Sequence, residues 1–131
     1  MRVITFGTFD LFHRGHLNVL KFAKSLGTHL SVGVSSDALN FNKKGAFPVY
    51  DQNDRLDLIR ELRMVDDVFL EESLEDKRNY IVERSADILV MGDDWAGKFD
   101  FLQDICKVMY VERTPSISST LIKAEIFNKS R

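Results

Sequence analysis

A chain of 131 residues is long enough for one ordinary domain and too short for two. A hydrophobic content of 44% excludes a disordered protein, and no apolar run approaches the roughly 18 residues that a membrane span needs. The formal net charge of −2 argues against a general affinity for nucleic acid, and the lone Cys106 cannot form an internal disulfide. We therefore expect one cytoplasmic domain, residues 1–131, that neither inserts into membranes nor binds nucleic acid.

Apolar runs that are typical of buried strands alternate along the chain with segments of helical periodicity. We expect strands at residues 3–7, 30–34, 68–70, 88–91 and 108–111. We expect helices at about residues 13–26, 52–63, 75–84 and 119–127, a loop over 35–50 and a short helix near Phe101. This alternation predicts an α/β fold: a single doubly wound, Rossmann-like domain whose five-stranded parallel sheet carries helices on both faces.

Two loops of this predicted fold contain the glycine and polar residues that a binding site needs. In doubly wound sheets ligands bind where the strand order reverses, which the common five-stranded order puts between the first and fourth strands. The loops after those strands are Gly7-Thr8-Phe9-Asp10 and Gly92-Asp93-Asp94-Trp95. We therefore expect the ligand to bind between them. Asp10 could bind Mg²⁺ or cap the turn that aims His13, and we favour the cap.

The first expected helix starts with His13-Arg14-Gly15-His16. The two histidines are three residues apart and share one face of a helical turn. Gly15 leaves room for a bulky ligand, and a helix N-terminus offers free N–H groups and partial positive charge, which suit a phosphate. The imidazoles can donate hydrogen bonds to phosphate oxygens. The alternatives are ordinary surface histidines or half a zinc site, which the lack of a nearby Cys or third His disfavours.

The segment from Gly7 to His16, G-T-F-D-L-F-H-R-G-H, resembles the signature of the cytidylyltransferase-like nucleotidyltransferases. Ile117-Ser118-Ser119-Thr120 is similar to a second signature of that superfamily, and Arg113-Thr114 precede it as they do in the glycerol-3-phosphate cytidylyltransferases. Residues 90–102 also resemble that group. The resemblance implies transfer of a cytidylyl group from CTP to a small alcohol phosphate, with glycerol 3-phosphate the leading acceptor, and release of pyrophosphate.

The resemblance also implies roles for individual residues. His13, His16, Lys44 and Arg113 are the expected catalytic residues. The nucleotide is expected to bind to Thr8, Phe9, His13, Arg14, Gly15, His16, Lys44, Gly92, Asp93, Asp94, Trp95, Arg113, Thr114, Ile117, Ser118, Ser119 and Thr120. The acceptor is expected to bind to Lys43, Arg55, Arg63 and Lys77. Which of Lys43 and Lys44 reaches the α-phosphate stays open at this point.

The expected cofactor is Mg²⁺, which would arrive with CTP rather than occupy a metal site of the protein. The resemblance further implies a homodimer, for which the apolar stretch of Met64-Val65 with Val68-Phe69 could supply a surface.

Two other functions remain open from the sequence. One is an adenylyltransferase that uses ATP on another phosphorylated acceptor, and the other is a non-catalytic nucleotide-binding module on the same fold. The loop between Asp37 and Arg55 is one residue longer than in the glycerol-3-phosphate enzymes, which leaves the identity of the acceptor open. For Arg55, Arg63 and Lys77, a solvated surface position is the alternative to a functional one.

Overall fold

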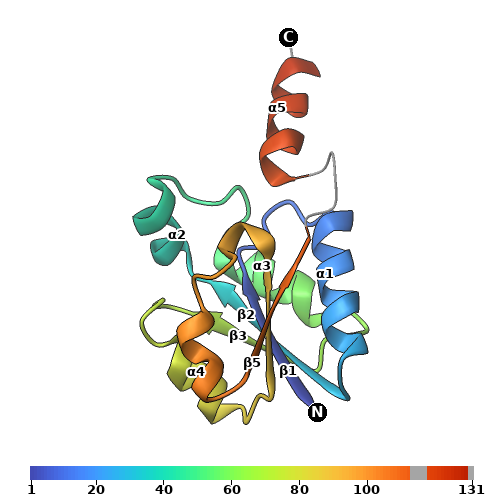
Figure 1. Ribbon diagram of the computed structural model, residues 1–131. Coiled ribbons are helices and arrows are strands. Elements are labelled where there is room, and N and C mark those ends of the chain that lie inside the picture. Colours follow the sequence, from blue (N-terminus) through green and yellow to red (C-terminus); the bar gives the residue numbers. More distant parts are fainter. Residues whose placement is uncertain (113–117, 130–131) are drawn as a thin grey trace.

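In the computed structural model, which describes residues 1–112 and 118–129, strands and helices alternate along the chain (Figure 1). The strands are β1 (Arg2–Gly7), β2 (His29–Ser35), β3 (Asp67–Glu71), β4 (Ile88–Gly92) and β5 (Lys107–Val111). The α-helices are α1 (Arg14–Ser25), α2 (Asp37–Lys44), α3 (Gln52–Arg60), α4 (Lys77–Glu83) and α5 (Ser119–Lys129). Two short 3-10 helices, η1 (Asp93–Trp95) and η2 (Asp100–Asp104), lie between β4 and β5. The predicted α/β fold is confirmed.

The five strands form one sheet in the order β3-β2-β1-β4-β5, and every neighbouring pair is parallel. The chain leaves β1 toward β2 and β3 and then returns to β4 on the other side of β1. The strand order therefore reverses between β1 and β4, as the sequence predicts. The carboxyl ends of these two strands open a crevice at one edge of the sheet.

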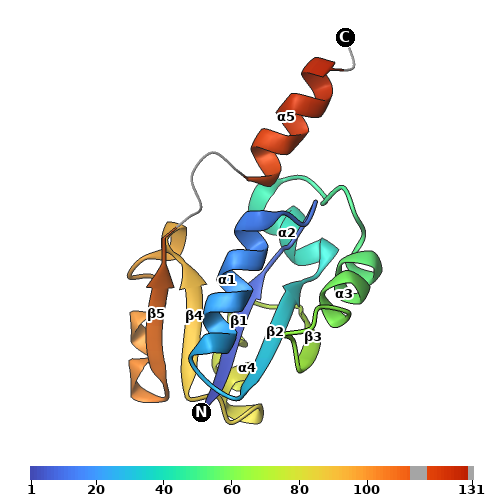
Figure 2. The same ribbon diagram turned by 90° about the vertical axis from the view of Figure 1, so that its right-hand side faces the viewer.

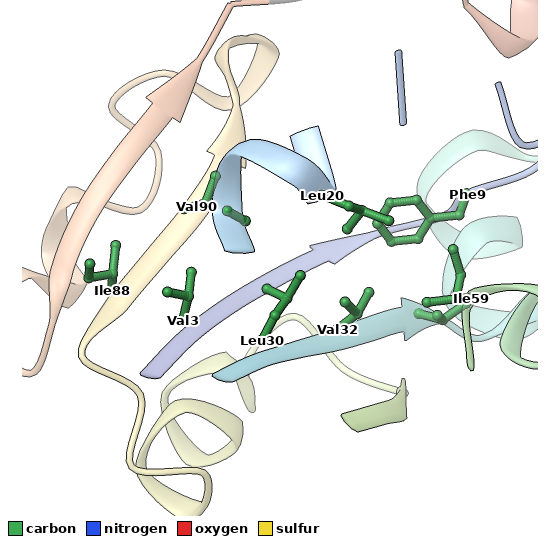
Figure 3. Packing of buried hydrophobic residues seen from close by; sticks show 10 residues of the cluster. Val3, Phe9, Leu20, Leu30, Val32, Ile59, Ile88 and Val90 are labelled. Atoms are coloured by element: carbon green, nitrogen blue, oxygen red, sulfur yellow. The ribbon is translucent and has the colours of Figure 1, made fainter. Parts of the chain in front are cut away.

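Side chains of the central strands alternate between two apolar layers, because successive residues of a strand point to opposite faces. Val3 of β1 packs in one layer with Leu20 of α1 and Ile59 of α3 (Figure 3). Ile4 of β1 packs in the other layer with Ile81 of α4 and with residues around η2. Helices thus cover both faces, which is why β1 and β4 are apolar on both sides.

One helix lies where the sequence analysis expects a loop. The Ser36 hydroxyl caps α2 by accepting a hydrogen bond from the Leu39 N–H at 3.0 Å, and Gly45 ends it with a left-handed φ of 73°. A capping serine and a terminal glycine are the ordinary helix boundary signals. These signals alone do not predict the helix, because the eight residues between them contain only three apolar side chains and show weak periodicity.

The last helix, α5, projects away from the sheet and its layers (Figures 1 and 2). Its first turns reach the rest of the molecule through Asp10: the Ser119 hydroxyl donates to the Asp10 carbonyl at 2.5 Å, and the Lys123 ammonium lies 3.3 Å from the carboxylate. No residue of α5 is fully buried. Among the described residues, no helix combines the length and apolar character required to cross a membrane.

Candidate active site

A cleft of about 370 Å³ opens at the carboxyl edge of the sheet, where the loops after β1 and β4 meet. We call it the main cleft. Its walls include residues of both predicted loops, of the segment between α2 and α3, and of α5: Gly7, Thr8, Phe9, Asp10, His16, Asn40, Lys44, Phe47, Gly92, Asp94, Trp95, Ser119, Thr120 and Lys123. The main cleft therefore lies where the topology predicts the binding site.

The two histidines of the His13-Arg14-Gly15-His16 motif form a reciprocal cap at the start of α1. The Nδ1 of His13 accepts a hydrogen bond from the Gly15 N–H at 3.0 Å, and the Nδ1 of His16 accepts one from the His13 N–H at 3.2 Å. Their rings stack with centroids 3.8 Å apart. Because both Nδ1 atoms are acceptors, each neutral ring carries its proton on Nε2. Two Nε2–H donors are thereby fixed beside the N-terminus of a helix.

Both rings are held neutral by their surroundings. The pKa of His16 is lowered to about 4, chiefly by burial and in part by the neighbouring His13, while Asp10 opposes the shift. Burial also lowers the pKa of His13. At neutral pH the pair therefore donates two neutral hydrogen bonds, and α1 contributes the positive end of its dipole.

Gly7 and Phe9 together position the His16 ring. A Cβ on Gly7 would lie 2.8 Å from two atoms of the Phe9 ring, so any other residue there would displace that ring. Phe9 has a left-handed φ of 55°, which is uncommon outside glycine, and its buried ring meets the His16 ring edge-on at 5.4 Å. The unusual backbone thus places an aromatic support against His16.

Asp10 does not cap the turn before His13. Its carboxylate accepts hydrogen bonds from the N–H groups of Val49, at 2.7 Å, and Tyr50, at 2.9 Å, in addition to the contact with Lys123. Burial raises the pKa of Asp10, but these hydrogen bonds and Lys123 outweigh it and lower the pKa overall. The predicted cap is therefore wrong: Asp10 fastens the segment between α2 and α3 to α5.

A second cavity, of about 100 Å³, adjoins the main cleft on the face of the sheet covered by α4. We call it the lysine pocket, after Lys43, Lys44 and Lys77 in its wall. Lys44 and Trp95 line both cavities, whereas Lys43 lines only the lysine pocket. Lys44 alone of the pair lines the main cleft, which favours Lys44 as the residue that reaches the α-phosphate, and this role stays a prediction.

Lys77 is almost fully buried in this wall. Its ammonium lies 2.7 Å from the Glu71 carboxylate and 3.6 Å from the centre of the Phe6 ring. Burial lowers the pKa of Lys77, and the attraction of Glu71 opposes that shift. The placement is compatible with the predicted role in acceptor binding, which stays a prediction.

A third cavity, of about 210 Å³, lies beside the main cleft and shares His16, Gly92, Asp94 and Ser119 with it. We call it the side cleft. It contains the predicted nucleotide-binding residues His13, Gly15, Asp93 and Ser118. The two clefts together gather most of the predicted nucleotide-binding set. Arg14 is exposed and lies outside these cavities, and Arg113, Thr114 and Ile117 lie outside the described residues.

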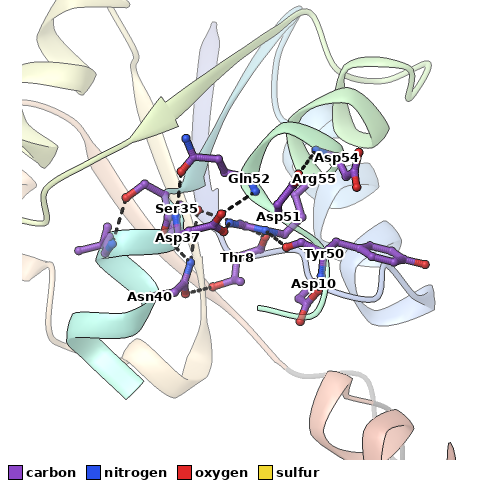
Figure 4. Close-up of polar contacts among 12 residues, drawn as sticks. Thr8, Asp10, Ser35, Asp37, Asn40, Tyr50, Asp51, Gln52, Asp54 and Arg55 are labelled. Carbon is purple, nitrogen blue, oxygen red and sulfur yellow. Dashed lines mark hydrogen bonds and ion pairs between the residues drawn. The ribbon is translucent and has the colours of Figure 1, made fainter. Parts of the chain in front are cut away.

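Arg55 is buried and faces protein groups rather than a cavity (Figure 4). Its guanidinium donates to the carbonyl oxygens of Thr8 at 2.9 Å, Ser35 at 2.8 Å and Tyr50 at 3.0 Å, and it pairs with the Asp37 carboxylate at 2.7 Å. Arg55 therefore holds the ends of β1 and β2 and the start of α3 together. Because its hydrogen bonds are directed into the protein, the structure gives Arg55 a structural role, and its contact with the acceptor stays a prediction.

Arg63 lies at the opposite edge of the sheet from the cavities. It follows α3 and comes just before Asp66, whose N–H donates to the Leu30 carbonyl at the amino end of β2. The cavities described above lie at the carboxyl ends of the strands and Arg63 does not line them, so its predicted contact with the acceptor gains no support within one chain and stays a prediction. Met64, Val65, Val68 and Phe69 are partly buried and pack against the core clusters, and their predicted place at a dimer surface stays a prediction.

Three polar residues are among the cavity residues that were not predicted. Asn40 is buried and its amide oxygen accepts a hydrogen bond from the Thr8 hydroxyl at 2.8 Å, while Lys123 and Glu71 line the main cleft and the lysine pocket. Glu71 could have been found as a charged residue at the carboxyl end of a predicted strand. Lys123 stands four residues after Ser119, on the same helical face. Asn40 could not be found from the sequence, because the helix that carries it, α2, was not predicted.

The described residues contain no group of three His, Cys, Asp or Glu side chains that could hold a metal ion. The polar groups of the main cleft are mainly N–H, ammonium and hydroxyl donors. A cleft of this kind suits a polyphosphate, and any Mg²⁺ would be bound chiefly by the phosphate oxygens.

Comparison with known proteins gives one consistent family. The family described as cytidylyltransferase-like matches residues 4–125. The chain is 48% identical to a glycerol-3-phosphate cytidylyltransferase of Bacillus subtilis (strain 168) over 126 residues, which cover 95% of this chain and 96% of that one. It is 41% identical to a protein of the same name from Staphylococcus aureus (strain NCTC 8325 / PS 47), over 98% of this chain and 96% of that one.

A solved structure, the lipopolysaccharide core biosynthesis protein from Thermoplasma volcanium GSS1, superposes with a TM-score of 0.78 and 32% identity, over 87% of this chain and 98% of that one. The family match spans both loops, the His13–His16 motif and all three cavities. The chain belongs to the cytidylyltransferase-like family of nucleotidyltransferases.

Proposed function

We propose that this chain transfers the cytidylyl group of CTP to glycerol 3-phosphate, forming CDP-glycerol and pyrophosphate. The observation that carries the proposal is the wall shared by the main cleft and the lysine pocket, in which Lys44 touches both cavities. A nucleotide in the main cleft and a phosphorylated acceptor in the lysine pocket would meet at this residue. The relatives named glycerol-3-phosphate cytidylyltransferase, which align over nearly the whole chain, support the choice of both substrates.

The reaction is an in-line displacement at the α-phosphorus of CTP. A phosphate oxygen of glycerol 3-phosphate forms the new P–O bond, the bond from the α-phosphorus to the bridging oxygen of the β-phosphate breaks, and pyrophosphate leaves with that electron pair. The attacking oxygen carries no proton at neutral pH, so no general base is required. The barrier comes from bringing anions together, so alignment and charge neutralisation supply the catalysis.

The donors of the site fit that requirement. The Nε2–H groups of His13 and His16 would bond to phosphate oxygens as charge shifts toward the leaving group. In the first turn of α5, Thr120 adds a hydroxyl, and Ser119 and Thr120 add N–H groups, for the β- and γ-phosphates. Lys44 would reach the α-phosphate, and Lys43 and Lys77 would hold the phosphate of the acceptor. Bound Mg²⁺ would screen the charge of the triphosphate.

We also propose that the enzyme is a homodimer and acts in the cytoplasm. The dimer is supported by α5, where Leu121 and Ile126 are more than half exposed on a helix that projects from the body. Exposed apolar residues flank the main cleft as well, at Phe47 and Val49. A cytoplasmic location is supported by Cys106, which is buried and unpaired as a free thiol.

A panel of nucleotides and acceptors tests the proposed function. Pyrophosphate release should be at least tenfold faster in kcat/KM with CTP than with ATP when glycerol 3-phosphate is the acceptor, and it should require a divalent cation. Preference for ATP would establish the adenylyltransferase alternative, and binding of CTP without turnover of any alcohol phosphate would establish the non-catalytic one. If phosphocholine exceeds glycerol 3-phosphate tenfold, which is about 1.4 kcal/mol, the acceptor is wrong and cytidylyl transfer stands.

A further inference from the structure

Glu71 is a buried carboxylate in the wall of the lysine pocket. It is the last residue of β3, its side chain is 1% exposed, and its Oε2 accepts a hydrogen bond from the Lys77 ammonium at 2.7 Å. The described residues donate no hydrogen bond to its other oxygen, Oε1. Among the described residues, the buried side-chain atom without a hydrogen-bond partner is Nδ1 of His29. Because Oε1 of Glu71 has no such donor and is not among the fully buried atoms without a partner, it keeps some exposed surface. The cavity that Glu71 lines is the lysine pocket.

A buried ion pair is energetically unfavourable compared with apolar packing in this wall. Removing a carboxylate and an ammonium from water costs free energy for each ion, and apolar residues of similar volume often stabilise a protein as well or better. The pair stands beside apolar neighbours, Phe6 and Phe99, whose ring centres lie 3.6 and 4.9 Å from the Lys77 ammonium. Packing alone therefore does not account for Glu71.

The polar groups of the pocket divide into two chemical kinds. Three ammonium groups, those of Lys43, Lys44 and Lys77, attract an anion, whereas the Glu71 carboxylate can only accept hydrogen bonds. A ligand that satisfies both kinds has a phosphate at one end and a hydroxyl group at the other. The side chains of Leu74, Met91 and Phe99 lie in the same wall and can contact the carbon atoms between them. The excess of positive charge disfavours an acceptor that carries an ammonium group.

We infer that Glu71 selects hydroxylated acceptors, because its Oε1 accepts a hydrogen bond from a hydroxyl group of the alcohol phosphate while its Oε2 holds Lys77 for the acceptor phosphate. The inference rests on the proposed function and adds to it the residue that recognises the hydroxyl group of the acceptor. A site built around a buried acceptor rejects an analogue that lacks the hydroxyl, because the carboxylate then loses its partner.

The test is the ratio of kcat/KM for glycerol 3-phosphate to that for n-propyl phosphate, which has the same carbon chain without hydroxyls. The wild-type chain should favour glycerol 3-phosphate by a hundredfold or more. Glu71→Gln, which keeps the shape and replaces a charged acceptor with a neutral one, should lower the ratio about tenfold. Glu71→Leu should bring it close to one. The KM for CTP should stay within twofold in Glu71→Gln, because the residue does not line either nucleotide cleft.

A matched control is Glu72→Gln, which removes the charge of the exposed neighbouring residue and should leave the ratio unchanged. If Glu71→Gln lowers kcat/KM equally for both acceptors, Glu71 is only structural and the inference is overturned, and this holds even where Glu71→Leu does not fold. Higher activity of the wild type with phosphoethanolamine than with glycerol 3-phosphate would also overturn it. If the wild-type chain releases no pyrophosphate from CTP with any alcohol phosphate, the proposed function is overturned as well. The two failures are therefore distinguishable.

Discussion

The ring of His16 is held in place by one hydrogen bond and three ring contacts. Its Nδ1 is bonded to the His13 N–H, one face stacks on the His13 ring, and Phe9 and Phe12 lie with their ring centres 5.4 Å away. The remaining polar atom, Nε2, belongs to a residue that lines both the main cleft and the side cleft. Such a donor is organised before the substrate binds, which is the condition under which a hydrogen bond contributes most to catalysis.

His16→Ala should therefore lower kcat by a hundredfold or more, about 3 kcal/mol of transition-state stabilisation, with a smaller effect on CTP affinity. Steady-state kinetics with CTP and glycerol 3-phosphate measure this. His29→Gln is the matched control, since it changes a histidine at the amino end of β2, away from the cavities, and should keep kcat within twofold. Near-normal turnover in a folded His16→Ala protein would remove His16 from the mechanism.

The lowered pKa of His16 also predicts how stability depends on pH. Its folded value is about 4 and its ordinary value is 6.5, so between these the unfolded chain binds more protons than the folded one. The free energy of unfolding should be fully retained above pH 6.5 and fall as the pH drops toward 4. For this group alone the loss between pH 7 and pH 5 is about 2 kcal/mol.

Urea unfolding at pH 7 and at pH 5 checks this dependence. His16→Gln should lose less free energy of unfolding between the two pH values than the wild type does, because Gln does not titrate. Equal losses in both proteins would show that His16 titrates near its ordinary pKa.

At the scale of elements, the loop after β1 depends on the absence of a side chain at Gly7. Gly7→Ala should lower the free energy of unfolding by about 1–3 kcal/mol, since the new methyl group overlaps the Phe9 ring. It should also lower kcat, because Phe9 supports His16. Chemical denaturation and kinetics of the same preparation measure both effects.

Gly92→Ala is the control for this change. Gly92 ends β4 at the other side of the crevice, an added Cβ there meets nothing within 4 Å, and its φ of −64° suits any residue. Its free energy of unfolding should change by less than about 0.5 kcal/mol. A Gly7→Ala protein as stable as Gly92→Ala would mean that the Phe9 ring moves aside at little cost.

The order and type of the strands could be predicted from sequence, because β1 and β4 are apolar on both faces and short loops with glycine follow them. The reversal between these strands then located the main cleft. The roles of Arg55 and Arg63 could not be predicted, because a charge in the sequence does not show which way a helix turns it. Arg55 is directed into the protein, and Arg63 lies beyond the end of α3, near the amino end of β2; only the packing of α3 on the sheet decides this.

At the scale of the whole molecule, the homodimer should depend on α5. Leu121→Asp should convert a dimer to a monomer in light scattering at micromolar concentration, because a charge replaces an apolar side chain that is 52% exposed in the single chain. Val82→Asp is the matched control: Val82 is 59% exposed on α4, which covers one face of the sheet, and its substitution should leave the mass unchanged. A wild-type protein with the mass of one chain would refute the dimer.

Trp95 is the only tryptophan of the sequence, and it stands in the wall that the main cleft and the lysine pocket share. The ammonium groups of Lys43 and Lys98 lie 5.8 and 5.5 Å from the centre of the Trp95 ring. The protein therefore carries a built-in fluorophore whose emission should respond separately to nucleotide and to acceptor, because each would change the solvent and the charges around the indole from a different side. Stopped-flow records of this signal would reveal which substrate enters first, without a label and before any chemistry occurs.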